Sequence, residues 1–132
     1  MKLGQYQKAK GHFERALFIY EQALPEGHPD LAMVISSLGA VSMELGQHQN
    51  AKRCFERALS TYEQTLPEGH SQLATVINNL GGVSMKLGQC QEAKRCLERT
   101  FSIYERALPE GHLQLAIVIS DLGAVLNELR QC

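Results

Sequence analysis

The residues of this chain best suited to chemistry are its histidines and cysteines, which could together hold a metal ion. His28, His70 and His112 recur 42 residues apart, each in the sequence Pro-Glu-Gly-His. A zinc site needs ligands that converge on one point, and its cysteines usually stand in short spacings such as C-x-x-C. Residues one repeat apart do not converge easily, so we predict a structural or helix-capping role for the three histidines.

The four cysteines give no stronger sign of a metal site. Cys54 and Cys96 occupy one position of the repeat, and Cys90 and Cys132 another. A gap of six residues puts Cys90 and Cys96 on different faces of a helix, and no C-x-x-C spacing occurs. Nothing marks a secreted chain, so we predict reduced thiols that contribute to helix packing. No pattern typical of catalysis is present, and we expect neither a cofactor nor enzymatic activity.

The composition excludes several classes of partner. Lys and Arg number 13, Asp and Glu number 14, and 44% of the 132 residues are hydrophobic. Without a basic field we expect no binding to nucleic acid. The longest apolar run is far below the roughly 20 residues that span a bilayer, and no hydrophobic segment follows a basic N-terminus in the manner of a signal peptide. We therefore expect a cytoplasmic protein with no membrane contact.

A repeat of 42 residues organises the sequence. The segments 3–44, 45–86 and 87–128 align without gaps, and the first two share 28 identical residues out of 42. Each segment holds two stripes of apolar residues at helical spacing. The first stripe, which we call the B helix, begins at Ala9, Ala51 or Ala93. The second, the A helix, begins at Leu31, Leu73 or Leu115.

The turns between these helices agree with the spans. Leu-Pro-Glu-Gly-His follows every B helix, and Leu-Gly-Gln separates an A helix from the next B helix. Proline and glycine favour such reversals, and Gly46 and Gly88 are suited to end the A helices. Because each helix has one apolar stripe, a repeat must stack on its neighbours to enclose a core. We therefore predict an all-α, antiparallel helix-pair solenoid with the helix order B-A-B-A-B-A.

Glycines in the middle of the A helices also require an explanation. Gly39, Gly81 and Gly123 each cost about 1 kcal/mol relative to alanine in a helix interior. We predict that they allow close approach of the following B helix, through Ala51, Ala93 and their neighbours.

The small residues form a recognisable pattern. It comprises a Leu-Gly pair, a later Gly-x-x-x-x-Ala, and then Phe and Ala, as in Leu38, Gly39, Gly46, Ala51, Phe55 and Ala58. This pattern resembles the tetratricopeptide repeat (TPR), and the period of 42 resembles the variant found in kinesin light chains. The resemblance implies one right-handed α-α superhelix over residues 1–132. It also implies a concave groove, lined by the A helices, that holds a peptide or helix of a protein partner.

Positions that differ between the repeats are candidates for that groove. Asn78 and Asn79 resemble groove asparagines that bind a peptide backbone in kinesin-light-chain-like repeats. The basic residues that grip a free carboxylate in other relatives are absent. The full candidate set is Met33, Ser36, Ser37, Ala40, Met43, Glu44, Thr75, Asn78, Asn79, Gly82, Met85, Lys86, Ile117, Ser120, Asp121, Ala124, Asn127 and Glu128.

The two ends of the sequence match the interior of the repeat, so we expect a fragment of a longer array without polar capping helices. Uncapped apolar stripes favour association. The last A helix of one molecule would dock on the first B helix of the next, giving a head-to-tail homo-oligomer. The residues expected to be partly bare are Ala9, Phe13, Leu17, Tyr20, Leu115, Ile119, Leu122, Val125 and Leu126.

Three functions are compatible with this sequence. The first is a noncatalytic scaffold that binds a protein or peptide partner in the groove. The second is a structural array that assembles through its ends. The third is the sensor region of a larger signalling protein.

Overall fold

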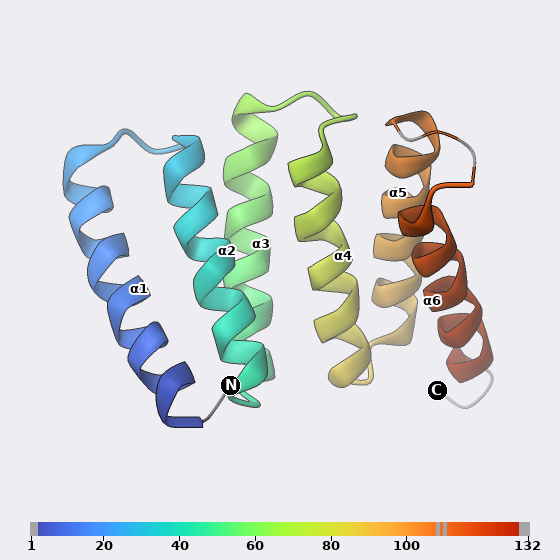
Figure 1. Cartoon of the computed structure of the whole chain (residues 1–132), viewed down its shortest axis with the longest axis horizontal. Coiled ribbons are helices and arrows are strands. Elements are labelled where there is room, and N and C mark those ends of the chain that lie inside the picture. Colours follow the sequence, from blue (N-terminus) through green and yellow to red (C-terminus); the bar gives the residue numbers. More distant parts are fainter. Residues whose placement is uncertain (1–2, 108, 110, 130–132) are drawn as a thin grey trace. The chain divides into compact units, whose positions relative to one another are not determined.

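The computed structural model describes residues 3–107, 109 and 111–129, which form six α-helices and no strand (Figure 1). The chain divides into two compact units, Met1–Leu66 and Pro67–Cys132. Each unit contains three helices, and successive helices within a unit run in opposite directions (Figure 1). The prediction of an all-α helical repeat fold is confirmed.

The first unit is built around its middle helix. It consists of α1 (Leu3–Ala23), α2 (Pro29–Glu44) and α3 (His48–Thr65), and α2 packs against both of the others. Helix α2 is an A helix, whereas α1 and α3 are B helices. Only α2 and α3 contribute fully buried side chains, and α1 contributes none. The buried hydrophobic residues of this unit are Leu31, Ala32, Val34, Ile35, Val41, Ala51, Phe55, Ala58 and Tyr62.

The second unit contains α4 (Ser71–Lys86), α5 (Cys90–Ala107) and α6 (Leu113–Leu129). Helix α5 is a B helix that packs against the A helices α4 and α6 on either side. Both α4 and α5 are extensively buried, whereas α6 buries only Val118 and Val125. Val125 packs in a cluster with Ala93 and Leu97 of α5.

Glycine ends the A helices α2 and α4 as the sequence predicts. Gly46 has φ +76 and Gly88 has φ +74, a left-handed conformation that residues with a side chain rarely adopt. The N–H of Gly46 donates to the carbonyl of Met43 at 3.0 Å, and the next N–H, that of Gln47, donates to Ser42 at 2.8 Å. These bonds satisfy carbonyls that the helix end leaves unpaired and turn the chain sharply into α3.

The mid-helix glycines make room for the B helices. A Cβ atom added at Gly39 would lie 2.9 Å from Cε1 of Phe55 and 3.1 Å from Cβ of Cys54. At Gly81 the nearest atom would be Cβ of Cys96, at 3.2 Å. The predicted close approach is therefore confirmed at both positions, although at Gly39 the nearest atoms belong to Cys54 and Phe55 instead of Ala51.

Gly123 differs from the two other glycines. A Cβ atom there would meet nothing within 4 Å. No helix among the described residues covers α6 at the place where α3 covers α2.

The difference between these glycines can be tested by substitution. We expect Gly39→Ala to destabilise the protein by about 1–3 kcal/mol, because the Phe55 ring is fully buried and has no room to move. Gly123→Ala is the matched control and should stabilise the helix by up to about 1 kcal/mol, since only helix propensity changes. Urea unfolding followed by circular dichroism measures both. A loss at Gly123→Ala equal to that at Gly39→Ala would contradict this account of the packing.

Candidate protein-interaction surface

The three repeated histidines cap helices. The Nδ1 atoms of His28, His70 and His112 each accept a hydrogen bond at 3.1 Å from the backbone N–H two residues later. His28 and His70 have the extended conformation of an N-cap residue. Each bond satisfies an N–H group that the first helical turn leaves unpaired. The predicted structural role is confirmed, and these side chains are not available as metal ligands through Nδ1.

Loss of one cap should lower stability without changing the fold. We expect His70→Ala to reduce the free energy of unfolding by about 1 kcal/mol, the usual cost of removing an N-cap acceptor. His70→Asn restores a side-chain acceptor and should recover most of the loss. Urea unfolding of the three proteins provides the comparison. Equal stability of His70→Ala and the parent protein would rule out a capping contribution.

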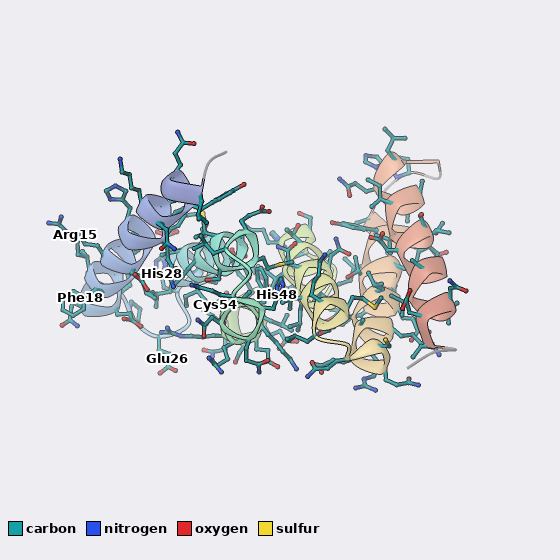
Figure 2. All side chains as sticks on the ribbon, turned by 90° about the horizontal axis from the view of Figure 1, so that it is seen from below. Arg15, Phe18, Glu26, His28, His48 and Cys54 are labelled. Carbon is teal, nitrogen blue, oxygen red and sulfur yellow. The ribbon has the colours of Figure 1, made fainter. Side chains whose placement is uncertain are left out.

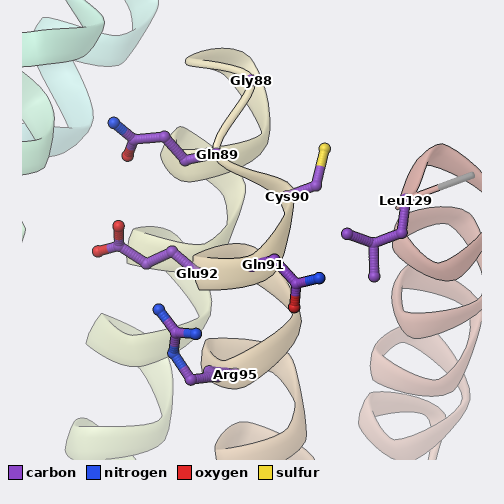
Figure 3. A pocket seen from close by; sticks show the side chains of 7 residues that line it. All are labelled: Gly88, Gln89, Cys90, Gln91, Glu92, Arg95 and Leu129. Carbon is purple, nitrogen blue, oxygen red and sulfur yellow. The ribbon is translucent and has the colours of Figure 1, made fainter. Parts of the chain in front are cut away.

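The cysteines behave differently from one another. Cys54 and Cys96 are reduced thiols, as predicted, but Cys90 is disulfide-bonded, so the prediction is wrong at that position. Cys132 lies outside the described residues. Cys90 lies near the start of α5 and faces Leu129 of α6 across a cavity (Figure 3). The sequence predicted that neighbouring helices stack, but its cysteine spacing did not indicate a disulfide at Cys90. Burial raises the pKa of the Cys54 thiol, which disfavours a reactive thiolate.

Within the described part of the chain, no three His, Cys, Asp or Glu side chains gather as metal ligands would. None of the six helices has the length and apolar character needed to cross a bilayer.

The candidate groove residues form one stripe on each A helix. On α4 they stand at i, i+3, i+4, i+7, i+10 and i+11 from Thr75, a spacing that follows a single helix face. Every candidate on α2, α4 and α6 is half-buried or exposed. The remaining faces of α2 and α4 carry the buried residues, such as Ile35 and Ile77. The A helices therefore present the variable positions on their more accessible faces.

The chemistry of this stripe is mixed. Small residues occupy its middle, with Ala40, Gly82 and Ala124 at equivalent positions, and a Cβ atom at Gly82 would meet nothing within 4 Å. Met33 and Ile117 share another position, and each is 49% exposed. Such a surface can receive apolar side chains beside polar groups that bind a backbone.

The polar residues of α4 differ in the hydrogen-bonding groups that they have available for a bound peptide. The Thr75 hydroxyl donates to the carbonyl of Ser71 at 3.1 Å and is therefore engaged within its own helix. The Oδ1 atom of Asn78 is shielded from solvent and has no hydrogen-bond partner. A bound segment would reach that oxygen only after the side chain turned. Asn79 is half-buried on the same face, and its amide carries both a donor and an acceptor.

The predicted association residues of α1 are half-buried, which agrees with the partial exposure expected for them. This stripe is half-buried because it lies on the side of α1 that packs against α2. It comprises Ala9, Phe13, Leu17 and Tyr20. The bare apolar residues of this helix are instead Phe18, 64% exposed, and Ile19, 55% exposed. The sequence contained one signal for Phe18, since the other repeats have Ser60 and Ser102 at that position.

The corresponding set on α6 is divided. Ile119 and Leu126 are exposed, at 54% and 50%. Leu115 and Leu122 are half-buried. The expected exposure is wrong for Val125, which is 2% exposed because it faces α5. The bare face of α6 is therefore narrower than the apolar pattern of the sequence suggests.

Comparison with known proteins identifies the class of this fold and then the family. Helices that are antiparallel within each unit, with a packing glycine in α2 and in α4, define an α-helical repeat protein. The sequence profile described as tetratricopeptide repeat matches residues 1–64 and 72–132. The chain belongs to the tetratricopeptide repeat family.

Solved structures show the same architecture. Kinesin light chain nearly identical TPR-like repeats from Podosopora anserina superpose with a TM-score of 0.87 at 26% identity, over 92% of this chain and 57% of that one. BtubC (BKLC) from P. vanneervenii gives a TM-score of 0.86 at 27% identity, over 94% of this chain and 50% of that one. This chain thus spans between half and three fifths of these neighbours. No curated protein matches it.

Proposed function

We propose that this protein is a noncatalytic interaction scaffold whose A helices hold a peptide or helix of a partner protein. One observation carries the proposal. Within the A helices, the positions that differ between the repeats lie mostly on the accessible face, while the residues of α2 and α4 that repeat unchanged are largely buried. Unchanged positions maintain the fold, so variable accessible positions are free to specify a partner.

The partner's chemistry follows from the same face. Small residues and exposed Met33 and Ile117 favour a segment with apolar side chains. Ser37 and Asn79, at equivalent positions, offer groups that can bond to a peptide backbone. Lys86 is the only basic residue of the candidate set, so the proposed recognition does not rely on gripping a free carboxylate.

Selection from a random peptide library, followed by affinity measurement on the whole chain, tests the proposal. We expect Asn79→Ala to weaken the selected peptide by about tenfold, because one buried hydrogen bond to the peptide backbone is lost. Met33→Ser should weaken it through lost apolar contact.

Glu56→Ala is the matched control for Asn79→Ala. Glu56 is exposed on α3, a B helix, and lies outside the candidate face. If Glu56→Ala reduced affinity while Asn79→Ala and Met33→Ser did not, the peptide would bind elsewhere and the proposed groove would be rejected.

Self-association is a second candidate function. It is supported by apolar residues that are at least half exposed on α1 and α6, namely Phe18, Ile19, Ile119 and Leu126. Exposed apolar area of this kind favours contact with another protein surface. Sedimentation at increasing protein concentration tests it, and a single monomeric species throughout would reject it.

A further inference from the structure

A partly apolar cleft of about 580 Å³ lies between α5 and α6, beside the turn that joins them. Phe101, Leu115 and Ile119 supply its apolar side, and Glu105 supplies a carboxylate. The remaining lining residues are Gly111, His112 and Ala116. No other described helix covers this cleft.

The first unit contains the same cleft in a covered form. The equivalents of Glu105, Leu115 and Ile119, 84 residues earlier, are Glu21, Leu31 and Ile35. There α3 closes the cleft and leaves about 300 Å³, lined on the α3 side by Arg57, Ser60, Thr61 and Gln64.

An ion pair and a close steric contact hold α3 over that covered cleft. Nη2 of Arg57 donates to Oε2 of Glu21 at 2.6 Å. Oε1 of Gln64 lies 2.6 Å from where a Cβ atom of Gly27 would stand, so this side chain rests directly on the glycine of the turn. The B helix is thus held both to the preceding B helix and to the turn.

The second unit repeats this type of contact. Arg99, 42 residues after Arg57, donates from Nε at 3.0 Å and from Nη2 at 2.8 Å to the carboxylate of Glu68. These hydrogen bonds lower the pKa of Glu68 below its ordinary value, against a smaller effect of burial. The arginine at this position of a B helix thus binds a carboxylate in both units, that of Glu21 on α1 in the first and that of Glu68, in the turn before α4, in the second.

Helix α1 has a face equivalent to the face of α3 that covers the first cleft, and no described helix packs on it. Arg15, Phe18, Ile19 and Gln22 stand 42 residues before the four α3 residues that cover the first cleft, and all four are exposed. Arg15 and Phe18 lie on the side of α1 turned away from α2 (Figure 2). No described residue bonds to Arg15.

We propose that α1 of a second copy of this chain docks in the α5–α6 cleft and repeats the packing of α3 on α1 and α2. Arg15 of the second copy pairs with Glu105, as Arg57 pairs with Glu21. Phe18 enters the apolar cleft, and Ile19 packs near Ile119. This interface is separate from the proposed peptide groove and defines how the molecules join head to tail.

Burial at equivalent positions supports this occupant. Ile35 and Ile77 are 2% and 1% exposed where a B helix covers the A helix, whereas Ile119 is 54% exposed. Docking would extend an interface that already exists inside the chain.

Two residues differ from their equivalents in the other repeats in a way that suits an interface between separate molecules. Leu126 stands where the other A helices have buried Ser42 and Ser84, and Phe18 stands where the other B helices have serine. Both changes add apolar surface to the two faces that would meet. Two separate molecules lose translational and rotational freedom when they associate, and the interface must offset this loss. Helices that belong to one chain do not incur that loss when they pack. The extra apolar surface supplies that additional stabilisation.

Sedimentation velocity of the whole chain over a range of concentrations tests the interface. We expect reversible, concentration-dependent association. Phe18→Ser should raise the dissociation constant by about 10-fold to 100-fold, because a large buried aromatic side chain is lost from the interface. The monomer should remain folded, since serine occupies this position in both other B helices. Met33→Ser is the control for removing an exposed apolar residue and should leave association unchanged.

Charge exchange tests the ion pair. Arg15→Glu and Glu105→Arg should each weaken association by about tenfold or more through like-charge contact, and the double variant should recover most of it. Arg53→Glu makes the same charge change on α3, where Arg53 bonds to Asn50 of its own helix, and should have little effect.

Gly123→Ala distinguishes loss of the interface from misfolding of the monomer. It should leave the monomer at least as stable and yet weaken association, because the equivalent Gly39 allows no Cβ atom beneath the covering helix. A monomer at all concentrations would overturn the proposal. So would association that is insensitive to Phe18→Ser and to the charge exchange. Peptide binding that persists in Phe18→Ser but fails in Met33→Ser would show that the groove and the docking face are independent.

Discussion

The fold depends on the close packing of each B helix against the glycine of its A helix. At Gly39 the space is so restricted that a single added carbon would meet the buried Phe55 ring. The glycine lowers the intrinsic stability of the A helix. In return, the helices approach closely enough to bury Ile35 and Ser42 on either side of the contact. Burial of this seam, repeated in α4 and α5, provides the core.

The packing of a B helix against the glycine of an A helix also explains which surfaces remain accessible. Helix α6 keeps the glycine, but no described helix packs over it, so Ile119 and Leu126 are exposed. Helix α1 has the complementary situation, with Phe18 and Ile19 uncovered. The stripe that we propose as a groove lies on a different face of the A helices. One helix pair can therefore support a peptide and a neighbouring protein molecule through separate surfaces.

Repetition separates residues that maintain the fold from residues that are free to vary. The leucine, alanine and glycine positions shared by the repeats are mostly buried or lie at turns, and the histidines shared by all three repeats cap helices. The same fold occurs in the kinesin light chain TPR-like repeats, at 26% sequence identity. Partner choice in the proposed scaffold would rest on positions such as Asn79, which the shared architecture leaves unspecified.

The sequence alone determined the helices, the turns, the family and the capping histidines. These features arise from hydrogen bonds between residues a few positions apart and from apolar spacing along one helix, and both are visible in the chain itself. Only the tertiary structure decided that Val125 is buried, that Phe18 is bare and that Cys90 forms a disulfide. It also left the Asn78 oxygen without a partner. Those outcomes depend on which neighbouring helix covers each helix face. An apolar stripe in the sequence shows that a helix face packs against a partner, but it does not show how many residues of that face the partner covers.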